Sequence, residues 1–143
     1  AKNALRQSLL LAAQNTDANI FWLRAYYILG DDSRNSSIFT KILSAAENGK
    51  TEFPFTTGKN KYDFIDVKLL AKMIATTSTQ DKYTGVINVC TGKPISLAER
   101  VEAFIKEKNL NIKLEYGAFP DRPYDSPLVY GDSTIIEKIM SNK

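Results

Sequence analysis

An arginine and two aspartates stand close together near the end of the chain, in a segment that contains several prolines. Arg122 and Asp125 are three residues apart, and Pro123 and Pro127 each fix φ and lack a backbone N–H. The segment is therefore neither a regular helix nor a central strand. A stiff loop that presents a guanidinium can bind phosphate, because the planar fork of arginine matches two phosphate oxygens. An ion pair of Arg122 with Asp125 or Asp121 is the alternative that these residues leave open.

The sequence contains no histidine, which limits the kinds of catalytic and metal site that it can form. Histidine is the commonest general base and the commonest transition-metal ligand, so Ser–His or Cys–His catalysis within these residues is excluded and no metal site is expected. The one cysteine, Cys90, lies in the apolar run of residues 86–90 and is expected to be a buried structural thiol. This cysteine usage suits a reducing cytoplasm.

The charge of the chain is mild and evenly spread. The net charge of +3 results from 19 basic and 16 acidic side chains, which indicates neither a nucleic-acid surface nor an anionic-membrane surface. No apolar stretch approaches the roughly 20 residues of a membrane span. We therefore expect neither a nucleic-acid partner nor a membrane segment.

Helical and extended patterns alternate along the chain, which predicts an α/β fold. Capping residues predict several helix starts: Ser36 or Ser37, Asp66, Ser96 with Glu99 as a capping box, and Asp132 or Ser133. The expected helices cover residues 2–14, 38–48, 67–75, 97–109 and the last segment up to Met140. The expected strands cover residues 20–29, 53–55, 62–65, 86–90 and 112–116.

Two of these strands, at residues 20–29 and 86–90, are more apolar than a small sheet requires. They call for neighbouring strands that the sequence does not contain. The chain also enters helical pattern at Ala1-Lys2-Asn3 without a capping residue before it. We interpret the sequence as a segment of a longer protein.

Five motifs in order resemble the C-terminal part of the extended short-chain dehydrogenase/reductase family, the NAD(P)-dependent nucleotide-sugar epimerases, dehydratases and reductases. Residues 1–5 resemble the end of the family's Tyr-x-x-x-Lys helix, and residues 23–30 resemble its Arg-x-x-x-x-x-Gly strand. Residues 62–67 are similar to Arg-Asp-Phe-Ile-His-Val, and residues 88–97 to Asn-Val-Gly-Ser-Gly-x-x-x-Ser-Val. Arg122-x-x-Asp125, followed by Asp132, resembles the family's last motif.

The resemblance implies the last strands and helices of a Rossmann-type fold plus the small C-terminal substrate-binding α/β subdomain. Residues 1–30 and 66–92 would be Rossmann-associated, and residues 31–65 and 93–143 would bind substrate. The family's glycine-rich cofactor turn and its catalytic tyrosine would belong to the N-terminal half, which is absent from this sequence. NAD or NADP is therefore implied for the complete protein, and none is expected for this chain by itself.

Roles for individual residues follow from the resemblance. Lys2 would be the catalytic lysine that also binds cofactor, and Tyr26 and Ile28 would lie near the nicotinamide. The implied substrate-binding residues are Tyr27, Phe55, Lys61, Arg122 and Asp125. The sequence departs from the family at Tyr27, where many members have asparagine, and at Tyr62, where an arginine usually binds the diphosphate. Asp66 replaces a histidine and is interpreted as a helix cap.

The function implied is the nucleotide-sugar-binding part of an NAD(P)-dependent epimerase, dehydratase or reductase, an isomerase or oxidoreductase of the cytoplasm that forms a homodimer. The segment is expected to be inactive when isolated. Two alternatives stay open: a non-catalytic dimerisation or scaffold segment, and a reductase of another carbonyl substrate on the same scaffold.

Overall fold

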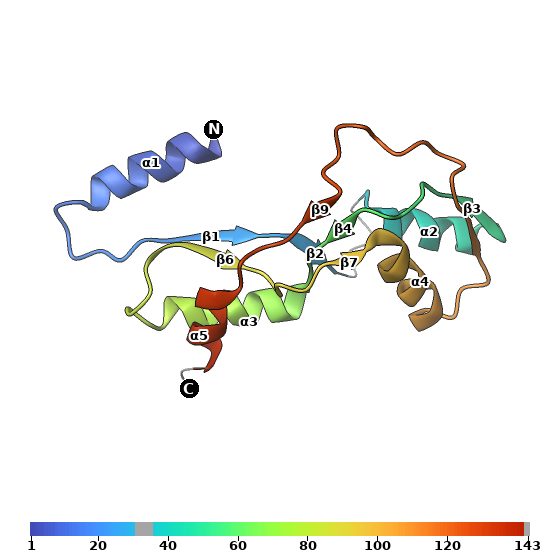
Figure 1. The fold of residues 1–143 in the computed structure, drawn as a ribbon. Helices are drawn as coiled ribbons and strands as arrows, with labels where there is room; N and C mark the ends of the chain where they lie inside the picture. The colour runs from blue at the N-terminus through green and yellow to red at the C-terminus, as the bar shows by residue number, and fades with distance from the viewer. Residues whose placement is uncertain (31–35, 142–143) are drawn as a thin grey trace. The chain divides into compact units, whose positions relative to one another are not determined.

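A computed structural model describes residues 1–30 and 36–141 of the chain. The chain divides into two compact units, each assembled from stretches that are separate in sequence. Helices and strands occur in both units (Figure 1), so the predicted α/β class is confirmed. Unit 1 consists of residues 1–29, 63–92 and 131–143, and unit 2 of residues 30–62 and 93–130.

Unit 1 contains two parallel strand pairs. Strands β1 (Phe21–Ala25) and β6 (Gly85–Val89) pair along their whole length, from Phe21 with Gly85 to Ala25 with Val89. Strands β2 (Tyr27–Leu29) and β5 (Phe64–Asp66) form the other pair. Parallel pairs are typical of sheets that are covered by helices, which is the sheet type expected for the two apolar runs.

Two helices, α3 (Val67–Ser78) and α5 (Thr134–Ser141), pack against the β1–β6 pair (Figure 1). Their apolar faces close the core of unit 1 together with residues of β5 and β6, because burying these side chains removes apolar surface from water. The buried residues of this core are Ile65, Leu70, Met73, Ile87, Val89, Ile136 and Ile139.

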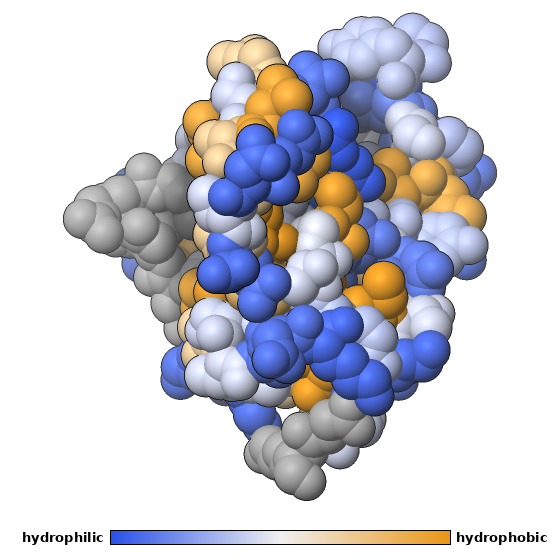
Figure 2. All heavy atoms as spheres, turned by 90° about the vertical axis from the view of Figure 1, so that its left-hand side faces the viewer, coloured by the Kyte–Doolittle hydropathy of each residue, from blue (hydrophilic) through white to orange (hydrophobic). Residues whose placement is uncertain are grey.

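Helix α1 (Lys2–Ala13) contributes nothing to this core. It has no buried residue, and no side chain caps its first turn. Leu5 and Leu11 are more than half exposed, at 56% and 65%. Figure 2 shows apolar side chains interspersed with hydrophilic ones on the face that it draws. No helix among the described residues is long and apolar enough to cross a membrane.

Two predicted strands are each split in the structure. The run 20–29, predicted as one strand, forms β1 and β2, because the chain changes partner from β6 to β5 at Tyr26. The run 62–65, also predicted as one strand, is interrupted at Asp63. Apolarity predicts that a segment is extended, but it does not predict which partner supplies the hydrogen bonds.

The described residues of unit 2 form two small sheets and two helices. Strands β3 (Glu52–Pro54) and β8 (Lys113–Glu115) pair in parallel, and β4 (Lys61–Tyr62) lies between β7 (Ile95–Ser96) and β9 (Leu128–Val129). Helices α2 (Ile38–Glu47) and α4 (Leu97–Glu107) bring apolar faces to the core. The buried residues of that core are Ile42, Ala45, Phe55, Val101 and Ile112.

Three predicted helix caps are confirmed. Ser37 accepts a hydrogen bond from the N–H of Thr40, and Asp66 accepts from two amides of the first turn of α3. Ser96 and Glu99 form the reciprocal capping box at the start of α4. Each cap satisfies amides that have no partner inside the helix.

The last stretch of the chain packs differently from the predicted division. Residues 131–143 belong to unit 1, where α5 contacts α3 and β6, whereas the sequence grouped residues 93–143 in one part. The boundary near residue 65 also lies slightly earlier, between Tyr62 and Asp63. The functional labels of the two parts remain predictions. Residues 31–35, assigned to the substrate-binding part, lie outside the described residues.

Gly131 generates the first testable prediction. A Cβ at this position would lie 2.6 Å from Sγ of Cys90 and 2.7 Å from the ring of Tyr26. Gly131→Ala should therefore lower the free energy of unfolding by about 1–3 kcal/mol, the usual cost of overpacking. Urea unfolding measures this loss. Because Cys90→Ala removes one of the two clashing groups, Gly131→Ala should cost less in that background, and equal costs in both backgrounds would contradict the packing.

The capping box generates a prediction about pH. The N–H and hydroxyl of Ser96 donate to Oε2 of Glu99 at 2.9 and 2.7 Å, and these bonds lower the pKa of Glu99 from 4.5. A carboxylate whose pKa is lower in the folded state stabilises the fold above its unfolded pKa and loses this effect as the pH falls through the folded value. Glu99→Gln should therefore be less stable than the parent at pH 7, and the difference should shrink below about pH 4.5.

Urea unfolding over a pH series measures this difference. The pH-dependent part should become smaller in a Ser96→Ala background, where the side-chain donor is missing and the backbone N–H remains. A Glu99→Gln penalty that stays constant on acidification would show that the capping carboxylate contributes nothing through its charge.

Candidate functional site

Unit 2 contains a cavity of about 770 Å³ that is bounded by three distant parts of the chain. Its lining comes mainly from the start of α2, from residues 53–62 and from residues 119–125. A volume of a few hundred to about 1,000 Å³ is typical of sites for small molecules and cofactors. Arg122 and Asp125 of the proline-containing loop line this cavity, as does Phe55.

Part of the lining is aromatic and aliphatic. Phe53, Leu97 and Phe119 contribute to the lining, and Phe119 is 54% exposed. Phe55 is only 2% exposed, because it belongs to the core of unit 2 and its ring meets that of Tyr116 edge-on at 5.7 Å. Exposed aromatic surface of this kind can cover the face of a planar ligand, and Phe119 offers more of it than Phe55 does.

Among the described residues, three cationic side chains line the same cavity: Lys41 of α2, Lys59 and Arg122. Asp121 and Asp125 are the acidic residues among this described lining. In the part of the chain that the structure describes, the Arg122 guanidinium has no carboxylate within ion-pair distance. The loop ion pair with Asp121 or Asp125, left open by the sequence, is thus not formed among these residues.

Asp121 bonds to Thr57 instead of Arg122. Its two carboxylate oxygens accept from the N–H of Thr57 at 3.2 Å and from the Thr57 hydroxyl at 2.5 Å. The N–H of Phe119 also donates to the carbonyl of Phe55 at 3.1 Å. These bonds fix the start of the proline-containing loop to the segment that forms another side of the cavity, immediately before Arg122.

The far end of the loop is also held. The N–H of Lys61 donates to the carbonyl of Pro127 at 2.9 Å, and β9 then pairs with β4. Between the two ends, the N–H of Asp125 donates to the carbonyl of Arg122 at 3.1 Å, which closes a turn. Arg122 is therefore presented by a short turn whose flanks are both hydrogen-bonded to the body of unit 2.

Lys61 is placed elsewhere. It lies on β4 and does not line the cavity, and its charge is one of the smaller causes that lower the pKa of Glu99. Tyr62, which occupies the position of the family's arginine, does line the cavity and accepts a hydrogen bond from Nδ2 of Asn60 at 3.4 Å. Lys41 and Lys59 are the lysines that accompany Arg122.

The remaining predicted residues belong to unit 1. Lys2 is the exposed first residue of α1. Tyr27 and Ile28 of β2 are exposed at 44% and 52%, and the ring of Tyr27 meets that of Phe64 edge-on at 5.9 Å. Tyr26 is partly buried, and this burial is the main cause that raises its pKa. The structure thus assembles Phe55, Arg122 and Asp125 around one cavity, and the cofactor-side residues remain predictions.

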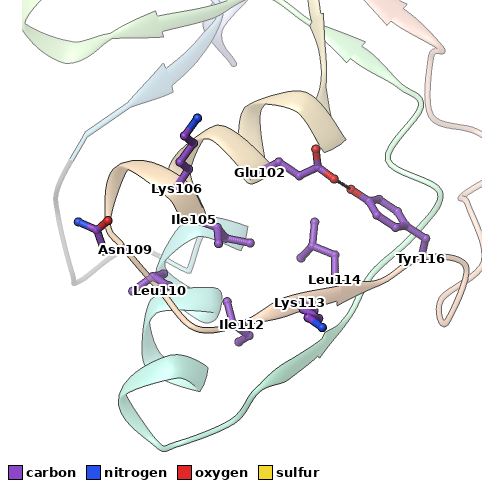
Figure 3. A pocket seen from close by; sticks show the side chains of 9 residues that line it. All are labelled: Glu102, Ile105, Lys106, Asn109, Leu110, Ile112, Lys113, Leu114 and Tyr116. Atoms are coloured by element: carbon purple, nitrogen blue, oxygen red, sulfur yellow. Dashed lines mark hydrogen bonds between the residues drawn. The ribbon is translucent and has the colours of Figure 1, made fainter.

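A second cavity of about 440 Å³ lies between α4 and β8 (Figure 3). Its apolar lining includes Ile105 and Leu114, and the hydroxyl of Tyr116 donates to Glu102 at 2.5 Å on one side of it. Burial and this bond raise the pKa of Tyr116 to about 12. None of the residues predicted to bind substrate or cofactor lines this cavity.

Sequence reasoning missed several residues of the larger cavity, chiefly Lys41, Lys59, Phe119 and Asp121. Lys41 follows Ile38 by one helical turn, so its place on the inward side of α2 could have been read from the periodicity. Lys59 directly follows a glycine turn and has no such signal. Among the described residues, no group of three His, Cys, Asp or Glu side chains could hold a metal ion.

Solved structures of known proteins share this architecture. A solved structure of UDP-N-acetylglucosamine 4-epimerase from Methanobrevibacter ruminantium M1, in complex with UDP-N-acetylmuramic acid, matches 99% of this chain with a TM-score of 0.80 and 26% identity. The match covers 46% of that protein. The predicted fold, the last part of a Rossmann-type enzyme with a small α/β subdomain, is therefore confirmed.

Sequence relatives agree with this class. The dTDP-6-deoxy-L-talose 4-dehydrogenase (NAD(+)) of Aggregatibacter actinomycetemcomitans is 48% identical over 132 residues, which are 92% of this chain and 48% of that protein. A probable UDP-arabinose 4-epimerase 3 of Oryza sativa subsp. japonica is 39% identical over 88 residues, 60% of this chain and 21% of that protein. No protein-family profile matches the chain.

The chain belongs to the extended short-chain dehydrogenase/reductase family of nucleotide-sugar epimerases and dehydratases, as its motifs predicted. It spans about half the length of the first of these curated relatives.

The Asp121–Thr57 bonds generate a prediction about the loop. Asp121→Ala removes both acceptors, and the loss of a charge-assisted hydrogen bond of about 1.4 kcal/mol should speed amide exchange at Thr57 and Phe119 roughly 10-fold. Hydrogen exchange read by NMR measures both sites. Asp125→Ala is the matched control, since the Asp125 contact within the turn is made by its backbone N–H. Equal exchange rates in the two variants would show that Asp121 does not hold the loop.

Proposed function

We propose that this chain is the nucleotide-sugar-binding part of an NAD(P)-dependent epimerase, dehydratase or 4-dehydrogenase. The nucleoside diphosphate enters the larger cavity of unit 2, and its diphosphate meets the guanidinium of Arg122. The observation that carries the proposal is the cavity itself, in which an arginine without a carboxylate partner among the described residues faces the same space as two lysines and aromatic surface.

The chemistry of a nucleoside diphosphate fits this lining. The diphosphate carries several negative charges, and Arg122, Lys41 and Lys59 supply positive charge around the cavity. Arg122 is suited to bind two phosphate oxygens at once, whereas the lysines act as point charges. Asp125, adjacent in the turn, is the acceptor for a ribose hydroxyl or orients Arg122. The exposed ring of Phe119 can cover a base, whereas Phe55 belongs to the core of unit 2.

The positions at which the sequence departs from the family's pattern change how the diphosphate would be bound. Tyr62 replaces an arginine with a phenol, which can donate a hydrogen bond to phosphate but brings no charge. The lysines at positions 41 and 59 compensate for that missing charge. Lys61, predicted to do so from its place in the sequence, is the less suitable candidate because it does not line the cavity.

The complete protein uses NAD or NADP in this proposal. Lys2 holds the cofactor ribose and lowers the pKa of a catalytic tyrosine that is not part of this sequence, while Tyr26 and Ile28 lie beside the nicotinamide and Tyr27 beside the sugar. Support comes from the 48% identical relative, whose name specifies NAD(+) and a dTDP-linked 6-deoxysugar. The 143 residues alone bind nucleotide and do not turn over substrate.

We also propose that the complete protein is a cytoplasmic homodimer. The leucines along α1, a helix without any buried residue, are the apolar surface that supports self-association. A purely structural dimerisation segment would share this surface but would have no use for the cationic cavity.

Binding of dTDP to the purified chain tests the proposal. Calorimetric titration should show saturable binding, and Arg122→Ala should weaken it roughly 10- to 100-fold, which corresponds to about 1.5–3 kcal/mol for hydrogen bonds to a charged group. Arg122→Lys should lie between the two, because it keeps the charge and loses the fork.

Lys113→Ala is the matched control, since Lys113 lines the smaller cavity instead and should leave the affinity for dTDP unchanged. The absence of saturable dTDP binding at millimolar concentration, or equal binding by Arg122→Ala and the parent, would refute the assignment of the site.

A further inference from the structure

Asp63 is a fully buried carboxylate with an unusual set of partners. It is 0% exposed, and in the part of the chain described here no basic side chain forms an ion pair with it. Its Oδ1 accepts from the N–H and the hydroxyl of Thr91 at 2.9 and 2.5 Å. Its Oδ2 accepts from the N–H of Gly92 at 2.8 Å and from the N–H of Gly131 at 3.3 Å. Burial without a cation is tolerable because these donors replace the water that a carboxylate loses.

These partners connect all three stretches of unit 1. Thr91 and Gly92 end the second stretch, 28 and 29 residues from Asp63, and Gly131 begins the third, 68 residues away. The backbone carbonyl of Asp63 accepts from the N–H of Tyr27 at 3.1 Å, which links the first stretch. One residue therefore joins segments that the chain sequence keeps far apart.

The hydrogen bond to Gly131 has a direct consequence for Tyr26. Gly131 lies so close to the Tyr26 ring and to Cys90 that no side chain fits between them, with the missing Cβ only 2.6 Å from Sγ of Cys90. Cys90 is 1% exposed and immediately precedes Thr91, the other partner of Asp63. The carboxylate thus holds two segments closed over one small cluster of Tyr26 and Cys90.

We infer that Asp63 is a positioning residue, whose carboxylate holds residues 90–92 and Gly131 against the ring of Tyr26 and whose carbonyl fixes the backbone of Tyr27. The functional meaning rests on the proposed function, in which these two tyrosines lie beside the nicotinamide and the sugar. Through these contacts Asp63 sets the orientation of two consecutive side chains without touching a ligand.

Cys90 provides the readout, since it is the only thiol in the chain and lies inside the cluster. The experiment uses the 143-residue chain and measures the rate at which a disulfide reagent, DTNB, modifies Cys90 without denaturant. Asp63→Asn keeps the shape of the side chain but replaces one acceptor oxygen with an NH₂ group that faces N–H donors. Modification of Cys90 should become at least about 10-fold faster, since a lost charge-assisted bond of about 1.4 kcal/mol opens the cluster by that factor.

Two controls separate local opening from general loss of stability. Asp66→Asn alters another carboxylate of unit 1, the cap of α3, and should leave the Cys90 rate within about two-fold. Leu70→Ala weakens the core of unit 1 and leaves the Asp63 contacts in place. At matched stability to urea, Asp63→Asn should expose Cys90 faster than Leu70→Ala does. The inference is overturned if the two rates agree, or if folded Asp63→Asn reacts as slowly as the parent.

Thr91→Val provides a milder test should Asp63→Asn fail to fold. It removes only the hydroxyl donor at 2.5 Å and leaves the amide donors of Thr91, Gly92 and Gly131, so an intermediate rate is expected. A Thr91→Val rate identical to that of the parent counts against the inference. The assay contains no nucleotide, so a failure of dTDP binding would refute the proposed function and leave this result standing.

Discussion

Unit 1 has to be assembled from three separate stretches of chain, and the buried carboxylate of Asp63 is where these stretches meet. Hydrophobic packing of β5, β6, α3 and α5 supplies most of the driving force, but such packing is not directional. The four donors around Asp63 are directional, and a buried anion tolerates little error in their positions. This one interaction therefore determines the placement of the loops after β6 and before α5, and of Tyr26 against Gly131.

In unit 2, a less buried carboxylate likewise joins separate segments of the chain. Asp121 bonds to Thr57 and thereby joins the proline-containing loop to the segment after β3. Because Asp121 is occupied in this way, Arg122 next to it is left to face the cavity. The two aspartates thus have related roles, one shaping the part of the chain assigned to the cofactor side and the other shaping the part assigned to the nucleotide.

Local signals in the sequence predicted the helices well. Caps at Ser37, Asp66 and Ser96 are contacts between residues two or three positions apart, so their outcome depends little on the rest of the fold. Strand pairing depends on distant partners, which is why the run 20–29 was predicted as one strand and is two. The short strands β7 and β9 carry too few residues for periodicity to reveal them.

In the candidate site too, local signals predicted some residues, while contacts with distant parts of the chain determined others. Arg122 and Asp125 could be predicted because prolines and family resemblance mark their segment, and both line the cavity. Lys41 and Lys59 could not be distinguished from other surface lysines, since only the tertiary fold brings α2 and the turn at Gly58 together. Asp63 stands between β4 and β5, in the run of residues 62–65, and looks like an interruption of a strand. Its role depends on amides up to 68 residues away, which no local pattern reveals.

The central claim is that the larger cavity of unit 2 receives a nucleoside diphosphate. Amide chemical-shift mapping by NMR during titration of the chain with dTDP tests this claim directly. The largest changes in amide chemical shift should fall on residues 55–60 and 119–125. The amide shifts of residues around the cavity of Figure 3, such as Ile105 and Leu114, should stay unchanged. Shifts centred on Ile105 and Leu114, or no shifts at millimolar dTDP, would contradict the claim.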